Sequence, residues 1–307
     1  MSKTILVRTD QLSHSEWLDW RRQGIGSSEA AAVCGKHPWR CSVHVYLDKI
    51  RELPHTPDTL PMKLGRMLKG TAAALFAEEH GWRLIRKKAI FRHPEHEFML
   101  ANIDRWIVGQ HTGLLCKTVR EYAKGDWEDR VPEHILIQCQ HLMAVTGADH
   151  WWIALLIGGQ QFRSIRVERD QRWIARIIAK EEQFWYQHVL PGIQPAWDGT
   201  PGSTELLKQL YPADHVSPSP LRLQEEADHW ADVYRCAESM EKAALRSKTE
   251  AENRIKGMLG SAEEGVTDRY LLEWKAIYPR SGRQSPYRRF KLSNLTDDGG
   301  SYEERKH

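Results

Sequence analysis

The sequence has no long hydrophobic run, few cysteines and little net charge. No apolar run reaches the roughly 18 residues that a membrane-spanning helix requires, and the opening residues MSKTILVRTD lack the apolar stretch of a signal peptide. The five cysteines are scattered and form no C-x-x-C pair, which argues against a zinc or iron–sulfur site and indicates a reducing compartment. We therefore expect a soluble protein of the cytoplasm.

The net charge of +3 over 307 residues is too small to attract nucleic acid by itself, so such a partner would need a local basic surface. The chain is long enough for one large domain or for one domain with an appendage. Residues 198–219 are rich in Pro, Gly and Ser without a sustained period, which indicates a linker. We expect a main domain at 1–197, a second segment at 220–293 and a disordered tail at 294–307.

Helical and strand periodicities alternate along residues 1–197. The expected helices cover residues 13–24, which begin with a Ser13-x-x-Glu16 capping box, 25–35, 64–81, 132–147 and 171–190. The expected strands cover residues 82–94, 98–109 and 112–119, followed by a hairpin at 150–170 that turns at Gly158-Gly159. This order predicts an α/β fold with a mixed central sheet flanked by helices, and residues 221–259 predict one long helix or a helical hairpin behind it.

Two charged residues end neighbouring predicted strands. Asp104 follows the apolar run MLANI, and Lys117 follows GLLC. Hydrolysis of a phosphodiester with Mg²⁺ requires carboxylates that hold the metal and a cation that steadies the attacking water, and this pair would supply one of each. A solvated ion pair is the other interpretation of an Asp and a Lys that face each other on a sheet, and the residues alone leave both open.

The order of several short motifs resembles that of the YqaJ-type viral recombinases, which are similar to the lambda-type alkaline exonucleases of the PD-(D/E)xK nuclease superfamily. After Trp17 and Arg21, the motifs are GIGSSEAAAVCG, HPW, LGRML-x-G, LANIDRWIVG, LLCKT, VPEHILIQCQHLMAVTG, FRSIRVERD and EEQFW. The resemblance covers residues 13–200. It implies a restriction-endonuclease-like core, 5′ to 3′ degradation of double-stranded DNA from its ends with Mg²⁺ or Mn²⁺, and a phage or prophage context in a bacterial cell.

The resemblance also implies a pocket for the 5′-terminal phosphate of DNA, formed by Arg21 and Ser28. A guanidinium and a hydroxyl near a helix N-terminus suit an anion. The alternative is structural, because Arg21 could instead cap a helix or pair with Glu29.

The catalytic residues are assigned in the same way. The resemblance implies that Asp104 and the backbone carbonyl of Cys116 bind metal, that Lys117 is the catalytic lysine, and that Gln138 orients water or phosphate. For Gln138 and its neighbour Gln140, an ordinary position on a helix surface is the alternative.

Two positions depart from the family pattern. Lys69 and Leu115 stand where the family carries metal-ligating glutamates. Leucine offers no lone pair and lysine brings a positive charge, so we expect metal affinity to fall sharply. Lys69 could pair with Asp104 in place of an ion, or it could point to solvent and leave Asp104 to Lys117. A carboxylate relocated to Glu29 or Glu78 would restore a ligand.

The sequence therefore suggests a DNA-processing protein that binds double-stranded DNA ends and is catalytically impaired. The alternatives are an active metal-dependent nuclease with a relocated carboxylate and a pseudo-nuclease that acts as a protein-interaction module. A single-strand-annealing or other DNA-processing protein is the implied partner, and relatives that form rings leave the oligomeric state open. A basic stretch near the C-terminus could track DNA or protect a strand edge, and its cations include Arg280, Arg283, Arg288 and Arg289.

Overall fold

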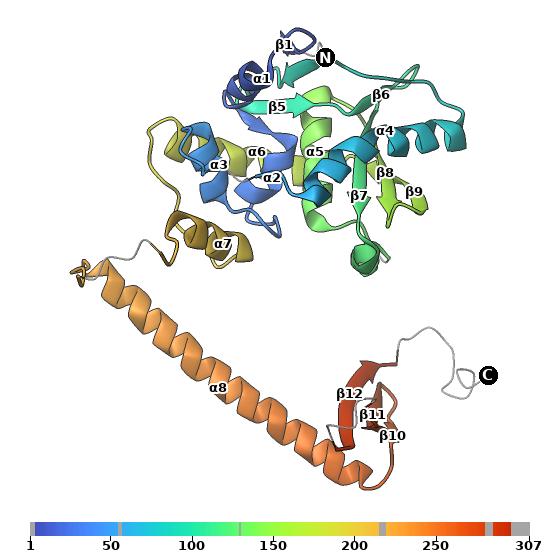
Figure 1. Ribbon diagram of the computed structural model, residues 1–307, viewed down its shortest axis with the longest axis vertical. Helices are drawn as coiled ribbons and strands as arrows, with labels where there is room; N and C mark the ends of the chain where they lie inside the picture. Colours follow the sequence, from blue (N-terminus) through green and yellow to red (C-terminus); the bar gives the residue numbers. More distant parts are fainter. Residues whose placement is uncertain (1–3, 55–56, 129, 215–218, 280–284, 296–307) are drawn as a thin grey trace. The chain divides into compact units, whose positions relative to one another are not determined.

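The protein forms two compact units, Met1–Val216 and Ser217–His307, which are described separately (Figure 1). The computed structural model describes residues 4–54, 57–128, 130–214, 219–279 and 285–295. None of the helices in these ranges is long and apolar enough to cross a membrane.

The first unit contains seven α-helices within the described residues. They are α1 (His14–Arg21), α2 (Ser27–Val33), α3 (Ser42–Lys49), α4 (Leu60–His80), α5 (Glu133–Thr146), α6 (Gln171–Phe184) and α7 (Pro201–Leu210). Its strands are β1 (Thr4–Arg8), β2 (Ile25–Gly26), β3 (Leu84–Ile85), β4 (Ala89–Arg92), β5 (Met99–Asn102), β6 (Arg105–Ile107), β7 (Gly113–Val119), β8 (His150–Ile157) and β9 (Gln161–Glu168). A 3₁₀ segment at Glu121–Trp127 and a π-helical turn at Trp185–Val189 also belong to this unit.

A five-stranded sheet in the order β3-β6-β7-β8-β9 forms the centre of this unit, beside a four-stranded sheet in the order β1-β4-β5-β2. The larger sheet is mixed, because β7 and β8 are parallel and the other pairs antiparallel. Helix α4 covers one face, where Phe76 packs with Cys116, and α5 covers the other, where Leu115 and Ile153 are buried (Figure 1). The predicted mixed sheet flanked by helices is confirmed.

Local signals in the sequence mark the ends of several elements. Ser13 caps α1 and forms the expected capping box with Glu16. The hairpin of β8 and β9 turns at Gly158 and Gly159, both of which have the positive φ that glycine tolerates.

The predicted three-strand meander is wrong in one respect that matters for function. Residues 82–94 and 98–109 do not form two long strands, because each divides into two short strands that belong to different sheets. The chain crosses between the sheets at residues 86–88 and again at 103–104. Alternating hydrophobicity continues through both crossings, so the sequence pattern could not reveal them.

Further elements were not predicted, among them β1, β2 and α3. The expected linker at 198–219 also differs, because it contains α7, whose Leu206 is fully buried. A Cβ at Gly202 would lie 2.8 Å from the backbone of Arg40, so α7 packs closely against the segment before α3 within the first unit, and only glycine fits there. Small residues, which suggested a linker, here allow close packing.

The second unit consists of α8 (Glu226–Leu259) and an antiparallel sheet of β10 (Glu264–Val266), β11 (Tyr270–Ile277) and β12 (Tyr287–Asn294). Of the two forms expected for 221–259, the single long helix is present. Arg280, Arg283 and all but the first two residues of the predicted tail at 294–307 lie outside the described residues.

Candidate active site

Asp104 lies at the crossing between the two sheets, directly before β6. Strand β6 pairs with β7 only at Trp106↔Gly113 and Arg105↔Leu114, so the next amide on that edge of β7, the N–H of Cys116, has no strand partner there. Asp104 Oδ2 accepts this N–H at 3.0 Å. The N–H and C=O of one strand residue point the same way, so the carbonyl of Cys116 faces the same edge, as its implied role requires.

The ammonium group of Lys69 donates to the other oxygen of this carboxylate. Its Nζ lies 2.7 Å from Asp104 Oδ1, and the Asp104 side chain is only 17% exposed. Of the two orientations left open for Lys69, the one toward Asp104 is present. Helix α4 brings Lys69 here because it packs across β7 and β8 with its small residues Ala72 and Ala73 inward.

Lys117 and Leu115 lie on the opposite side of β7 from the Cys116 side chain, because side chains alternate along a strand. Leu115 is buried in the same hydrophobic core as Ile135 of α5. Burial first, and then the ammonium of Lys69, lower the pKa of Lys117 to about 8, while Asp104 partly opposes this shift. Asp104 therefore favours the charged form of Lys117, although the ion pair of Asp104 is with Lys69.

These residues do not fit a hard divalent cation. Among the described residues that line this edge, Asp104 is the one carboxylate, and both of its oxygens already accept hydrogen bonds. Burial and then Asp104 raise the pKa of the Cys116 thiol to about 12, so this residue does not offer a thiolate. Across the described ranges, no three His, Cys, Asp or Glu residues gather in a way that could hold a metal ion.

A cavity of about 1030 Å³ opens beside Lys117. Three rings line it in mutual contact, with centroid distances of 5.7 Å between His37 and His134 and 6.0 Å between Trp39 and His134. Burial and then the charge of His134 lower the pKa of His37 to about 4, so its ring is neutral near pH 7. Neutral rings beside an amine form a surface on which a base could stack.

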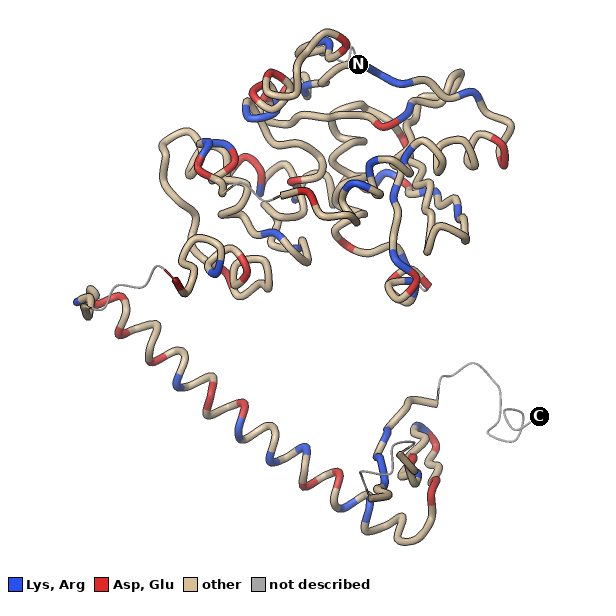
Figure 2. Tube along the Cα trace, in the orientation of Figure 1, with Lys and Arg blue, Asp and Glu red and all other residues tan. Residues whose placement is uncertain are grey.

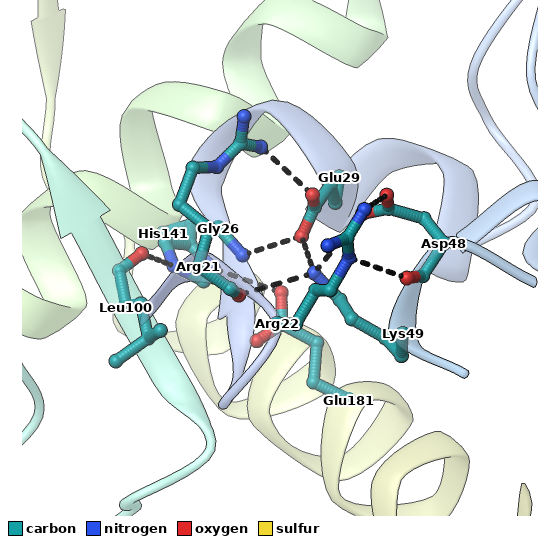
Figure 3. A network of polar contacts seen from close by, with 9 residues as sticks. All are labelled: Arg21, Arg22, Gly26, Glu29, Asp48, Lys49, Leu100, His141 and Glu181. Atoms are coloured by element: carbon teal, nitrogen blue, oxygen red, sulfur yellow. Dashed lines mark hydrogen bonds and ion pairs between the residues drawn. The ribbon is translucent and has the colours of Figure 1, made fainter. Parts of the chain in front are cut away.

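Arg21 belongs to a largely buried polar network that joins α1, α2 and α3 (Figure 3). Its guanidinium donates to Glu29 at 2.8 Å and lies 4.8 Å from the ring centroid of Trp17. Glu29 also accepts Lys49 Nζ at 2.7 Å and the N–H of Gly26 at 2.8 Å. The structural alternative for Arg21, pairing with Glu29, is therefore present, and it uses one guanidinium nitrogen.

Neither candidate for a relocated carboxylate reaches Asp104. Burial alone would raise the pKa of Glu29, but Lys49 and Arg21 lower it to about 2, so this residue is a buried anion engaged by two cations. Glu78 is exposed on α4, nine residues beyond Lys69 and so about 13 Å along the helix axis. Ser28 is exposed at the start of α2, close to Arg21 in the chain.

The two glutamines do not lie on an exposed helix surface, because both side chains are buried in α5. Gln138 Nε2 donates to Ser27 Oγ at 3.4 Å, and Gln140 bridges β9 and α6 through the backbones of Glu168 and Asp170. Gln140 is thus a structural residue, and Gln138 lies beside the N-terminus of α2.

Sequence reasoning missed the buried partners of this network. His141 Nε2 donates to the carbonyl of Leu100 at 2.9 Å, and its Nδ1 shares a hydrogen bond with Glu181 at 2.8 Å. Lys49 has a fully buried side chain. The one signal for His141 was its place inside an apolar helix, while nothing near Lys49 in the sequence indicates a partner twenty residues away.

Comparisons with known proteins show which family the chain belongs to. A family model described as YqaJ-like viral recombinase domain matches residues 16–149. The uncharacterized protein YqaJ of Bacillus subtilis (strain 168) is 34% identical over 277 residues, which are 89% of this chain and 86% of that protein.

Among solved structures, LHK-Exo in complex with dAMP aligns with a TM-score of 0.50 at 19% identity over 64% of this chain and 97% of that chain. Another crystal structure of LHK-Exo, an alkaline exonuclease from Laribacter hongkongensis, gives a TM-score of 0.48 at 18% identity over 56% of this chain and 91% of that chain. At such identities the similarity concerns the fold, which is the nuclease fold expected from the motifs. Because the match to the Bacillus subtilis relative extends through most of both chains, the protein belongs to the YqaJ-like viral recombinase family.

Proposed function

We propose that this protein binds the ends of double-stranded DNA and that its cleavage centre is impaired. The observation that carries the proposal is the 2.7 Å contact between Lys69 and Asp104, since it places an ammonium where a nuclease of this type needs a metal-bound carboxylate. Leu115, buried beside it on β7, removes the second ligand. Such a centre keeps its fold without a divalent cation, because Lys69 already balances the charge of Asp104.

The end-binding part of the proposal rests on Arg21 and Ser28. Both lie at the junction of α1 and α2, and the Arg21 side chain is 21% exposed. Glu29 orients the guanidinium, and a fixed guanidinium binds a terminal phosphate with less loss of conformational entropy.

The test is release of nucleotides from a linear, 5′-phosphorylated duplex, with Mg²⁺ and separately with Mn²⁺, in parallel with binding of the same duplex in EDTA. We expect binding without release. Robust release with either metal would contradict the impairment, and absence of binding would contradict the end-binding role.

A second candidate is a protein-interaction surface on α8. No residue of this helix is buried, and large apolar side chains such as Trp230, Tyr234 and Met240 are exposed on it. An exposed apolar surface favours a protein partner, for which a DNA-processing protein is the family-based expectation. Titration with blunt duplex at two salt concentrations separates the candidates, because binding to phosphates weakens steeply with salt.

A further inference from the structure

A pocket rich in cations surrounds Asp104. It encloses about 360 Å³, and six basic side chains line it against the single carboxylate of Asp104. These basic residues are Arg66, Lys69, Arg86, Lys87, Lys88 and Arg105. The two crossings between the sheets explain the cluster, since residues 86–88 and 103–104 pass from one sheet to the other at the same place.

Three of these cations are already engaged within the protein. Lys69 pairs with Asp104, Arg105 Nη1 donates to the carbonyl of Asp104 at 2.7 Å, and Arg66 Nη1 donates to Asp58 at 2.9 Å. Each of the three already donates to an oxygen of the protein, so they are less available to a ligand.

Arg86, Lys87 and Lys88 form no ion pair with any acid among the described residues. Their backbone is nevertheless fixed, because Thr9 N donates to the carbonyl of Lys88 at 2.9 Å and Ala89 N to that of Lys87 at 2.8 Å. The nearby Asp10 pairs with Arg8 at 3.5 Å, and a backbone hydrogen bond first, then Arg8 and last Lys88 lower the pKa of its carboxyl. These three residues belong to the basic part of the chain between α4 and β4, where Figure 2 draws Lys and Arg in blue. Three consecutive cations on a fixed backbone, with no ion-paired acid among the described residues, suit an anion.

We propose that the pocket of Arg86, Lys87 and Lys88 binds internal phosphodiester groups of duplex DNA without a metal ion. This inference rests on the proposed function and names the surface that holds the DNA backbone. Where carboxylates and metal ions would bridge protein and phosphate, the pocket presents ammonium and guanidinium groups, which contact phosphate oxygens directly. Internal phosphates are the expected ligands because the cations lie in a row along the chain, whereas one terminal phosphate needs a single convergent site.

The test compares two triple variants that lose the same charge. R86A/K87A/K88A empties the pocket of its unpaired cations, and R172A/R176A/K180A removes three exposed cations from α6 of the same unit. Binding of a blunt duplex is measured by fluorescence anisotropy in EDTA at several salt concentrations, with 5′-phosphate and with 5′-hydroxyl ends. A variant with Arg86→Lys, Lys87→Arg and Lys88→Arg keeps the charge and serves as the rescue.

We expect the pocket variant to bind at least about tenfold more weakly, and its salt slope to fall by about 0.9 for each phosphate that the variant no longer neutralises. The weakening should be equal for both kinds of end, and the control and the rescue should bind like the unaltered protein. Addition of Mg²⁺ at constant ionic strength should not tighten binding.

Unchanged affinity and slope in the pocket variant would overturn the pocket while leaving the proposed function intact. DNA binding by the unaltered protein only when Mg²⁺ is present would overturn the pocket and also contradict the binding in EDTA that the proposed function expects. If the unaltered protein binds no duplex in either condition, both the pocket and the proposed function fail.

Discussion

The resemblance to the family implies a metal-binding carboxylate at each of the two positions that Lys69 and Leu115 occupy. We expect the double change Lys69→Glu with Leu115→Glu to restore metal-dependent cleavage, since it rebuilds two oxygen ligands around Asp104 next to Lys117. Nucleotide release from a 5′-phosphorylated duplex with Mg²⁺ measures the effect.

The single changes are the controls for this prediction. Lys69→Glu alone gives a second carboxylate beside Asp104 but no ligand at position 115. Leu115→Glu alone places a charge at a site that is 5% exposed and leaves Lys69 on Asp104, so neither single change should restore full activity. A double variant that binds metal and DNA yet stays inert would show that more than these two positions has changed, and Gln138 would be the next residue to test.

Among single residues, Glu29 is expected to have the largest effect on the free energy of unfolding. Glu29→Gln would leave Lys49, whose side chain is fully buried, without its anion, and we expect a loss of about 3–5 kcal/mol in the free energy of unfolding. Urea denaturation measures it. Asp19→Asn is the matched control, because Asp19 is 44% exposed and its pairs with Arg22 and Arg51 should contribute less than about 1 kcal/mol.

The same residue gives the protein an acid dependence. The pKa of Glu29 is lowered from 4.5 to about 2, so the folded state favours the ionised form. The stabilisation from Glu29 is therefore complete above about pH 5 and is lost as the pH falls toward 2. The difference in stability between the unaltered protein and Glu29→Gln should shrink over that range, and a difference that stays constant would contradict the assignment.

At the scale of elements, strand β12 carries two neighbouring arginines whose surroundings differ. Arg288 lies 3.7 Å from the ring centroid of Trp274 and donates to the carbonyls of Trp274 at 2.8 Å and Gly260 at 2.9 Å, whereas Arg289 is exposed. We expect Arg288→Ala to speed amide hydrogen exchange in β11 and β12, because it removes bonds that join the sheet to the end of α8.

Arg289→Ala is the control, and it should leave hydrogen exchange unchanged. If this strand binds DNA, Arg289→Ala should also lower the salt slope of binding by about 0.9. Equal exchange in both variants would contradict the structural role of Arg288. The expectation of a shared DNA role for the two arginines therefore now rests on Arg289.

At the scale of the whole molecule, the charge balance at Asp104 predicts how the protein responds to metal. Mg²⁺ should raise the melting temperature very little, because Lys69 already holds the carboxylate that would bind the ion. A ligand at about 100 times its dissociation constant stabilises by about 2.7 kcal/mol, so a scan with excess Mg²⁺ detects a real site easily. A stabilisation of that size would contradict the ion pair and favour a relocated carboxylate.

The sequence by itself determined the features that depend on neighbours along the chain. The capping box at Ser13, the glycine turn between β8 and β9, the helical period of α5 and the order of motifs that identifies the family are all local patterns. The folded protein contains these features because backbone hydrogen bonds, turn geometry and the side-chain period are set within a few residues.

Only the tertiary structure decided which distant residues meet. It placed Lys69 on Asp104, joined Glu29 to Lys49, packed α7 against the backbone of Arg40, and brought residues 86–88 beside 103–104. Each of these depends on which strands pair and on where a strand leaves one sheet for another. An alternating pattern fixes the faces of a strand but not its partner, because pairing is selected by packing between segments far apart in the sequence.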